Sequence, residues 1–390
     1  MPPDPGPTVE TPAKRRRLFM RQKAMRRMVY ALVPVALSGV YFFGWRVAAL
    51  LAVSSAVALA TEYVTARRRG QPVSQAVFVT AWLLALALPP TTPLWIAGVG
   101  AFIAILFGKE VFGGFGRNFA NPAIVGRAFV YVCFPIELTG RFVPAFRGWP
   151  GGLVHWSFEG LAKVPDYVAA VARTGADAVT AASPMLALRD LGYTTPWWDL
   201  FWGTIGGVFE TPASYGPRVL AAGSIGEGCV PLIVLAGVYL AVTRTANWRL
   251  MVSPFIGAAA ATYLVLACGA RGVQPLTFKL LAGAFFYVSV FMITEPVSAP
   301  NRKGAMWAYG SLIGALIVIL SWKGQFVAAA SFSILLGNIV SPLLDMGARA
   351  WRGRKQPSGQ APSQPPAAPP AGPPEPPKGP RPAQEGGAPG

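Results

Sequence analysis

The chain has 390 residues, of which 53% are hydrophobic and only 13% are charged, whereas an ordinary globular protein carries roughly 25% charged residues. This composition excludes a soluble enzyme with an ordinary surface and favours a chain that contacts lipid. The net charge of +18 does not indicate nucleic-acid binding, because the Lys and Arg residues cluster between apolar stretches. Three widely spaced cysteines and one histidine predict neither a disulfide framework nor a zinc or iron–sulfur site.

Ten apolar segments are long enough, or nearly so, to cross the roughly 30 Å of hydrocarbon in a bilayer. The first five are predicted over residues 29–43, 47–64, 73–88, 94–107 and 123–136. The second five are predicted over residues 229–242, 251–268, 278–293, 307–321 and 326–344. We therefore predict an all-α polytopic membrane protein with about ten transmembrane helices in two five-helix halves.

The distribution of Lys and Arg predicts the orientation, because these residues favour cytoplasmic loops. Segments that ten spans place in the cytoplasm carry 21 of them, whereas the opposite short loops carry four. Both termini are therefore predicted to be cytoplasmic. The predicted regions are a basic N-terminal tail (1–27), a first half (28–136), a periplasmic insertion (137–228), a second half (229–346) and a disordered Pro/Gly-rich tail (347–390).

A weak internal similarity relates the two halves. The stretch 88–95 resembles 294–307, and Asn118 with Asn121-Pro122 resembles Asn338 with Ser341-Pro342. Such repeats occur in membrane proteins whose binding sites lie at broken helices. Chance is the alternative explanation, and the sequence leaves both open.

The stretch from 107 to 123 carries the densest signal. The residues that interrupt a helical pattern are Gly113, Gly114, Asn118, Asn121 and Pro122. Irregular backbone at membrane depth persists only where protein or an aqueous cavity shields it, which favours a functional site around Glu110. The alternative is a tight cytoplasmic loop with a solvated Lys109–Glu110 pair.

Acidic residues near the ends of spans form a second group: Glu62, Glu110, Glu137, Glu227, Glu295 and Asp345. Carboxylates in such places often line ion or proton paths, and hard cations prefer oxygen ligands. Glu62 is interpreted as extending towards Arg67–Arg69. Glu295 and Asp345 end spans next to prolines and are the stronger candidates for an ion path.

Together these stretches resemble the B-type subunit of the sodium-translocating NADH:quinone oxidoreductase family and, less closely, the D-type subunit of the related Rnf complex. The resemblance covers about residues 25–345. Its specific motifs are residues 88–95, 108–123, 223–227 and 294–299. That family has ten spans, in agreement with the count from hydropathy and charge.

The resemblance implies a covalent FMN, which a flavin transferase joins through its phosphate to a hydroxyl in the motif Asp-x-x-Ser/Thr-Gly-Ala-Thr on the outer side of the membrane. The residues on that motif are Asp177, Thr180, Ala182 and Ser183, so Ser183 would be the acceptor. Ala181 replaces the usual Gly and Ser183 replaces the usual Thr. Serine retains the hydroxyl that a phosphoester requires.

The resemblance also implies a noncovalent riboflavin, a quinone site on the cytoplasmic side, and a transient sodium path through Glu110 and Asp345. The implied location is the bacterial inner membrane. The chain has no GxGxxG on a strand–helix unit, so electrons from NADH would arrive through a partner flavoprotein subunit of a multisubunit complex. No catalytic residue is assigned. Sodium would compensate the charge of a reduced flavin at low dielectric.

Two other functions fit part of the pattern. The Rnf subunit shares flavin and fold, but it serves electron exchange between NADH and ferredoxin. A flavin-free secondary transporter with ten spans is compatible with the broken-helix signals alone. Flavin retained on the denatured chain separates the first two functions from the third.

Overall fold

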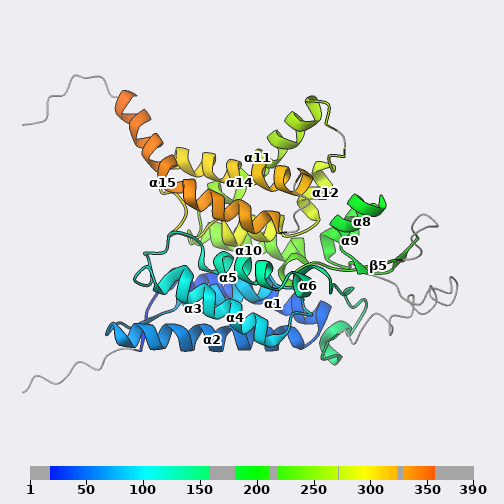
Figure 1. Cartoon of the computed structure of the whole chain (residues 1–390), viewed down its shortest axis with the longest axis horizontal. Helices are drawn as coiled ribbons and strands as arrows, with labels where there is room; N and C mark the ends of the chain where they lie inside the picture. The colour runs from blue at the N-terminus through cyan, green and yellow to red at the C-terminus, as the bar shows by residue number, and fades with distance from the viewer. Residues whose placement is uncertain (1–17, 158–180, 211–217, 271, 324–327, 356–390) are drawn as a thin grey trace, which may run out of the picture. The chain divides into compact units, whose positions relative to one another are not determined.

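A computed structural model of the protein describes residues 18–157, 181–210, 218–270, 272–323 and 328–355. Most of this part of the chain is helical (Figure 1). The helices of the first half are α1 (Lys23–Phe43), α2 (Arg46–Arg68), α3 (Ala76–Leu86), α4 (Leu94–Ile105) with the π-helical turn η1 (Leu106–Glu110), and α5 (Pro122–Cys133). Those of the second half are α10 (Val230–Val242), α11 (Trp248–Ala267), α12 (Leu276–Leu281), α13 (Phe285–Tyr287) with the π-helical turn η5 (Val288–Met292), α14 (Lys303–Lys323) and α15 (Ala329–Lys355).

Each apolar segment predicted from the sequence overlaps one or more of these helices. Within the described ranges, four helices are long and apolar enough to cross a membrane, namely α2, α11, α14 and α15. The all-α membrane class is therefore confirmed, whereas the count of ten spans stays a prediction. The short helices have a local cause, because α3 stops just before Pro89-Pro90 and α5 starts at Pro122.

The segment between α5 and α10 contains short elements. They are α6 (Pro135–Thr139), η2 (Gly151–Val154), α8 (Pro184–Leu191), α9 (Trp197–Trp202), η4 (Ile225–Glu227), β3 (Ala181–Ala182), β4 (Val208–Phe209) and β5 (Arg218–Leu220). β5 pairs in parallel with β3 and antiparallel with β4. A second small sheet pairs β1 (Phe19–Met20) in parallel with β2 (Val73–Ser74). Strands of two or three residues are too short to produce a recognisable alternation in the sequence.

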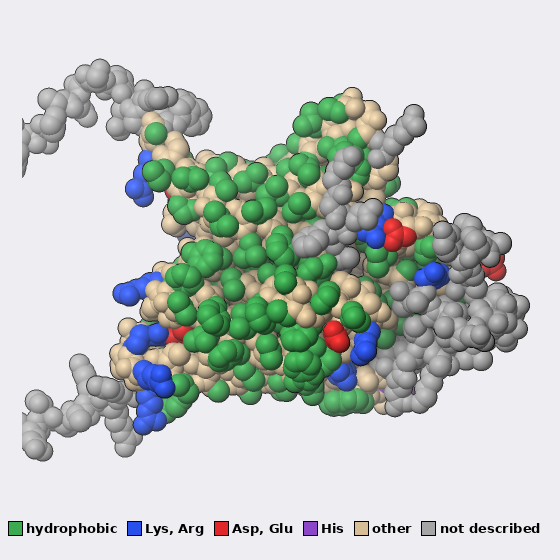
Figure 2. Space-filling model, viewed as in Figure 1, with side chains coloured by type: hydrophobic (Ala, Val, Ile, Leu, Met, Phe, Trp, Pro, Cys, Tyr) green, Lys and Arg blue, Asp and Glu red, His purple; other side chains and the backbone are tan. Residues whose placement is uncertain are grey.

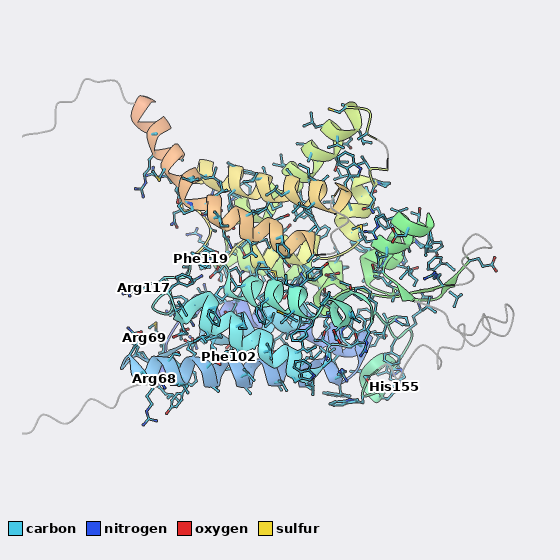
Figure 3. The ribbon with its side chains drawn as sticks, in the orientation of Figure 1. Arg68, Arg69, Phe102, Arg117, Phe119 and His155 are labelled. Atoms are coloured by element: carbon cyan, nitrogen blue, oxygen red, sulfur yellow. The ribbon has the colours of Figure 1, made fainter. Side chains whose placement is uncertain are left out.

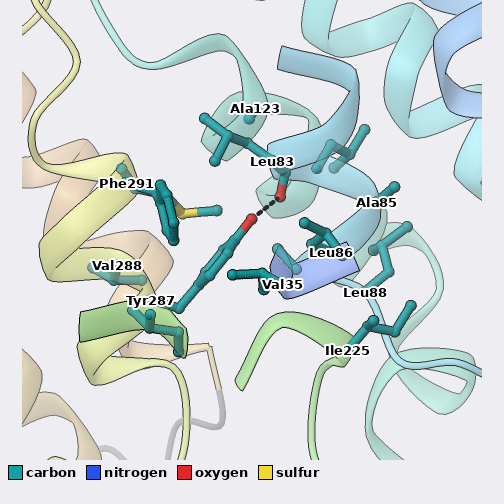
Figure 4. Close-up of a cluster of buried hydrophobic side chains, with 14 of the residues drawn as sticks. Val35, Leu83, Ala85, Leu86, Leu88, Ala123, Ile225, Tyr287, Val288 and Phe291 are labelled. Atoms are coloured by element: carbon teal, nitrogen blue, oxygen red, sulfur yellow. Dashed lines mark hydrogen bonds between the residues drawn. The ribbon is translucent and has the colours of Figure 1, made fainter. Parts of the chain in front are cut away.

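The two halves meet at a buried layer around Tyr287 (Figure 4). The Tyr287 hydroxyl donates a hydrogen bond of 3.1 Å to the carbonyl oxygen of Leu83, near the end of α3. The Phe291 ring lies 5.4 Å from the Tyr287 ring, one turn further along η5. The Arg46 guanidinium binds the carbonyl oxygens of Pro90 (3.1 Å) and Thr92 (3.1 Å), just beyond α3. The Arg46 contacts satisfy carbonyl groups in the turn after α3, whereas Tyr287 is a second donor to the Leu83 carbonyl oxygen, which also accepts from the Ala87 amide at 3.2 Å.

The two proposed internal-repeat motifs adopt different local structures. Asn121 caps α5, with its side-chain oxygen accepting from the Ala123 amide at 3.0 Å, and Pro122 is the first helical residue. Pro342, by contrast, lies inside α15. The repeat between the halves stays a prediction.

Charged side chains lie towards both ends of the helices, with a broad apolar surface between them (Figure 2). Arg68, Arg69 and Arg117 lie at one end, whereas His155 lies at the opposite end (Figure 3). The backbone amide of Trp45, between α1 and α2, donates to the His155 carbonyl at 3.1 Å. This arrangement agrees with the predicted orientation, in which the Arg-rich loops and the insertion lie on opposite sides of the membrane.

Helices α11 and α14 pack closely at small residues. A Cβ atom added to Gly314 would lie 2.0 Å from the Pro254 carbonyl oxygen, and one added to Gly257 would lie 1.9 Å from the Ser311 carbonyl oxygen. In lipid, small residues allow helix backbones to approach each other and gain van der Waals contact.

We predict that Gly314→Ala destabilises the protein by about 1–3 kcal/mol, because the new methyl group forces the two backbones apart. Thermal unfolding in detergent measures the effect. Gly347→Ala in α15 is the matched control, since no described atom lies within 4 Å of its added Cβ. Equal melting temperatures for the two variants would contradict the close packing of α11 and α14.

A second prediction concerns orientation. In a chain whose three cysteines are replaced by alanine, His155→Cys should react with a membrane-impermeant maleimide in intact cells. Arg117→Cys should react only after the membrane is permeabilised, because its loop is predicted to be cytoplasmic. Both native side chains are exposed. Labelling of Arg117→Cys in intact cells would overturn the predicted orientation.

Candidate functional site

The π-helical turn η1 places two adjacent charged residues against α2. Lys109 is 2% exposed and Glu110 is 4% exposed. The interpretation of this pair as part of a solvated loop is therefore wrong. A π-helical turn contains an extra residue, which shifts the side chains that follow it around the helix axis, and such turns are frequent at functional sites.

Glu62 is the buried partner of Lys109. The Lys109 Nζ lies 2.6 Å from Glu62 Oε2 and 2.6 Å from Ser74 Oγ. Ser74 donates to Glu62 Oε1 from its amide (2.8 Å) and from its hydroxyl (2.7 Å). The prediction that Glu62 extends towards Arg67–Arg69 is thus wrong, because the ammonium in η1 is nearer and removes the cost of burying the carboxylate alone.

Glu110 has a different set of partners on the same helix. Arg69 forms an ion pair with Glu110 Oε2, and Thr65 Oγ1 lies 2.8 Å from the same oxygen. Arg69 also donates to the Glu110 carbonyl oxygen at 3.2 Å. Glu62, Thr65 and Arg69 follow one another at three- and four-residue spacings, so one face of α2 serves both charges of η1.

The predicted irregular segment continues from η1 to the start of α5. Gly113 and Gly114 adopt φ angles of +102° and +96°, which L side chains rarely adopt. Asn118 donates to Glu295 Oε1 at 2.8 Å, and Asn121 donates to the Met292 carbonyl oxygen at 3.1 Å. The structure therefore brings together two motifs that are more than 170 positions apart in the sequence.

Glu295 and Asp345 lie in separate networks. Glu295 also accepts a hydrogen bond from the Ser298 hydroxyl. Asp345 accepts from the backbone amides of Asn301 (3.0 Å) and Arg302 (3.1 Å), next to the start of α14. Its local contacts therefore stabilise the end of a helix. The three carboxylates proposed for an ion path, Glu110, Glu295 and Asp345, thus have three different sets of partners.

Ser183 lines a pocket that three cationic side chains also line. Arg127, Arg189 and Lys279 line it together with Ser183. Its other polar residues are Tyr131, Ser224, Glu227 and Ser321, and its apolar walls include Phe142, Met185, Leu281 and Phe285. We name this the Ser183 pocket. Ser183 precedes α8, and its hydroxyl accepts from the Leu186 amide at 3.4 Å.

The inner end of the Ser183 pocket is polar. Arg127 donates to Ser224 Oγ at 3.2 Å and lies 3.9 Å from Glu227 Oε1. Burial raises the pKa of the Glu227 carboxyl, and Arg127 opposes that shift. Sequence reasoning missed Arg127 as a site residue. The available signal was a charged residue inside the predicted span 123–136.

Of the four residues on the flavin-attachment motif, the structure describes two. Ala182 is buried in β3 beside Ser183, which is 7% exposed. Asp177 and Thr180 lie outside the described residues. The positions of Ala182 and Ser183 are set by β3 and by the first turn of α8.

A second pocket lies among α1, α3, η1, α5 and η5. Its polar residues are Thr80, Lys109, Asn118, Asn121, Thr245, Thr294 and Glu295, and its apolar walls include Met25, Met28, Leu83, Phe115 and Phe291. We name it the Asn121 pocket. Apolar walls with a few convergent polar groups are typical of small-molecule sites.

The two pockets are lined by different residues of the same elements. On α3, Leu83 lines the Asn121 pocket, and Ala87, one turn further on, lines the Ser183 pocket. On the α13–η5 segment, Phe291 and Phe285 take the corresponding positions. Tyr287 lies between these two positions in the chain, and its hydroxyl binds the Leu83 carbonyl oxygen (Figure 4).

Comparison with known proteins places the chain in a family. The family described as NQR2, RnfD, RnfE matches residues 13–351. The chain belongs to the NQR2, RnfD, RnfE family. The match ends at residue 351, close to the end of the resemblance over about residues 25–345.

Relatives in this family carry two different names. The B-type subunit of the Na(+)-translocating NADH-quinone reductase of Chromohalobacter salexigens is 33% identical over 290 residues, which are 73% of this chain and 61% of the relative. The same subunit of Pseudomonas aeruginosa is 32% identical over 289 residues, with 73% and 62% coverage. The D-type subunit of the ion-translocating oxidoreductase complex of Halorhodospira halophila is 30% identical over 342 residues, with 82% and 88% coverage. The chain thus spans about 61% of the length of the first of these relatives.

Proposed function

We propose that the chain is a membrane subunit of a bacterial inner-membrane complex that moves electrons from NADH to a quinone and exports sodium. It would carry FMN on Ser183 and a noncovalent riboflavin. The observation that carries this proposal is the Ser183 pocket, in which an acceptor hydroxyl and three cationic side chains line the same space. The names of the NADH-quinone reductase relatives supply the reaction class.

The residues of the Ser183 pocket fit a flavin phosphate. A phosphoester on Ser183 carries negative charge, and Arg127, Arg189 and Lys279 are donors suited to it. The ester oxygen would stand at the N-terminal end of α8, where backbone amides and the helix dipole favour an anion. The apolar walls suit a flat aromatic ring.

The Asn121 pocket fits riboflavin, which has the same ring system but no phosphate. It provides amide groups from Asn118 and Asn121 for hydrogen bonds to the polar edge of a flavin. Met25, Met28 and Phe291 supply apolar surface for its faces. When bound, the two flavins would carry electrons across the membrane, and this chain would hold them in its two pockets.

The remaining proposed partners follow from the resemblance to the family. It would receive electrons from an NADH-oxidising flavoprotein subunit, use a flavin transferase for FMN attachment, and reduce quinone on the cytoplasmic side. Glu110, Glu295 and Asp345 are the proposed carboxylates of the sodium path. Glu110 is already compensated by Arg69, so a passing cation would compete with that guanidinium.

The D-type subunit of an Rnf complex is the second candidate. The observation in its favour is coverage, because the Halorhodospira halophila relative aligns over 82% of this chain and 88% of its own length. Both candidates involve flavin and ion transport, and they differ in the final electron acceptor. Purification with the native partner subunits and assay with quinone or ferredoxin separates the two candidates.

We predict that Ser183→Ala abolishes covalent flavin on the chain, because no ester can form without the hydroxyl. Ser183→Thr should retain or increase attachment, and Thr180→Ala should leave at least some. Ser224→Ala is the matched control, since it removes another hydroxyl of the same pocket. In-gel ultraviolet fluorescence and peptide mass spectrometry after co-expression with an active transferase measure attachment. FMN on Thr180, or unmodified Ser183, would defeat the assignment, and a flavin-free chain would favour a transporter.

We also predict that Glu110→Gln and Asp345→Asn leave assembly and flavin content intact but raise the sodium concentration needed for quinone reduction. Each change keeps the approximate shape of the side chain and removes the charge that a cation would meet. Glu137→Gln is the control, because this carboxylate lies in α6, at the start of the insertion. Unchanged sodium dependence in both variants would assign Glu110 and Asp345 to structure alone.

A further inference from the structure

We propose that the Lys109 ammonium raises the reduction potential of the flavin held in the Asn121 pocket by stabilising the negative charge that an electron adds. This inference rests on the proposed riboflavin site and assigns a role to a residue outside the proposed ion path. It starts from the position of Lys109, which lines the pocket although its side chain is almost fully buried.

The ammonium is held in place on one side. Glu62 Oε2 and Ser74 Oγ both lie 2.6 Å from Nζ, and these two residues do not line the pocket. On the other side, the Phe115 ring, whose centroid lies 5.9 Å from Nζ, lines the pocket. The charge therefore stands between its carboxylate partner and the pocket, and its two short contacts prevent it from turning towards water.

The charge of Lys109 should raise the reduction potential of a flavin in the Asn121 pocket. An electron that enters a flavin ring without a proton adds one negative charge, with NADH as the electron source in the proposed reaction. In a water-poor interior a nearby cation stabilises that charge more than it would in water. Lys109 is nearer to the pocket than Glu62, so the attraction by the ammonium outweighs the repulsion by its partner.

Glu295 lines the same pocket and opposes this effect if it is ionised. Its oxygens accept hydrogen bonds from Asn118 and Ser298, so it is fixed as well. The charged groups around the pocket are thus one ammonium and one carboxylate on its wall, with Glu62 behind the ammonium. Removing members of the Lys109–Glu62 pair one at a time should shift the potential in opposite directions.

The test uses the intact complex and four variants. Lys109→Met removes the cation, Glu62→Gln removes its partner, the double variant removes both, and Lys109→Arg keeps the charge. Noncovalent flavin is quantified after acid extraction, and its midpoint potential is measured by spectroelectrochemical titration. If a single variant does not assemble, the double variant and Lys109→Arg still provide the comparison, because neither leaves an unpaired buried charge.

Lys109→Met should lower the potential of the noncovalent flavin by at least a tenfold change in the equilibrium constant, about 59 mV for one electron. Glu62→Gln should raise it, the double variant should lie between Lys109→Met and the unmodified complex, and Lys109→Arg should stay near the unmodified value. Retained flavin with an unchanged potential in every variant would overturn the role of Lys109. An unmodified complex without extractable riboflavin would instead overturn the proposed function.

Discussion

Backbone groups that leave a helix within a membrane have no water to bind, and this constraint shapes the centre of the protein. Helix α3 ends there and helix α5 begins there, and hydrogen bonds link both regions to the α13–η5 segment. Side chains bind carbonyl groups near these helix ends: Tyr287 binds Leu83, Asn121 binds Met292, and Arg46 binds the turn after α3. The interrupted helices persist because partners from other elements replace the solvent.

The same constraint governs the buried charges. Lys109 and Glu110 are adjacent in the chain, yet Lys109 is compensated by Glu62 of α2 and Glu110 by Arg69, the residue that caps α2. A buried pair of this kind contributes little net stability, because desolvation offsets most of the attraction, whereas removing one partner is costly. Such pairs therefore suit a site whose charge has to stay fixed. In the proposed function, this fixed charge borders the space where an electron would arrive.

The two proposed flavin pockets share α3 and the α13–η5 segment as walls. Leu83 with Phe291, and Ala87 with Phe285, show that one set of helices lines both spaces. Three cationic groups line the pocket beside Ser183, where a phosphate would be attached. Threonine hydroxyls, two amides, one Lys and one Glu line the other, where no phosphate is expected. One short stretch of packed helices could thus hold two flavins of different chemistry.

The sequence by itself determined the membrane class, the positions of the apolar helices and the irregular segment after η1, because these depend on local hydropathy, proline and glycine. It also indicated the family through motifs whose order is preserved. Only the tertiary structure decided that Glu62 pairs with Lys109, that Asn118 meets Glu295, and that Arg127 shares a pocket with Ser183. Such contacts join residues far apart in the chain, and a π-helical turn changes which side chains face a neighbour, so spacing along the sequence does not reveal them.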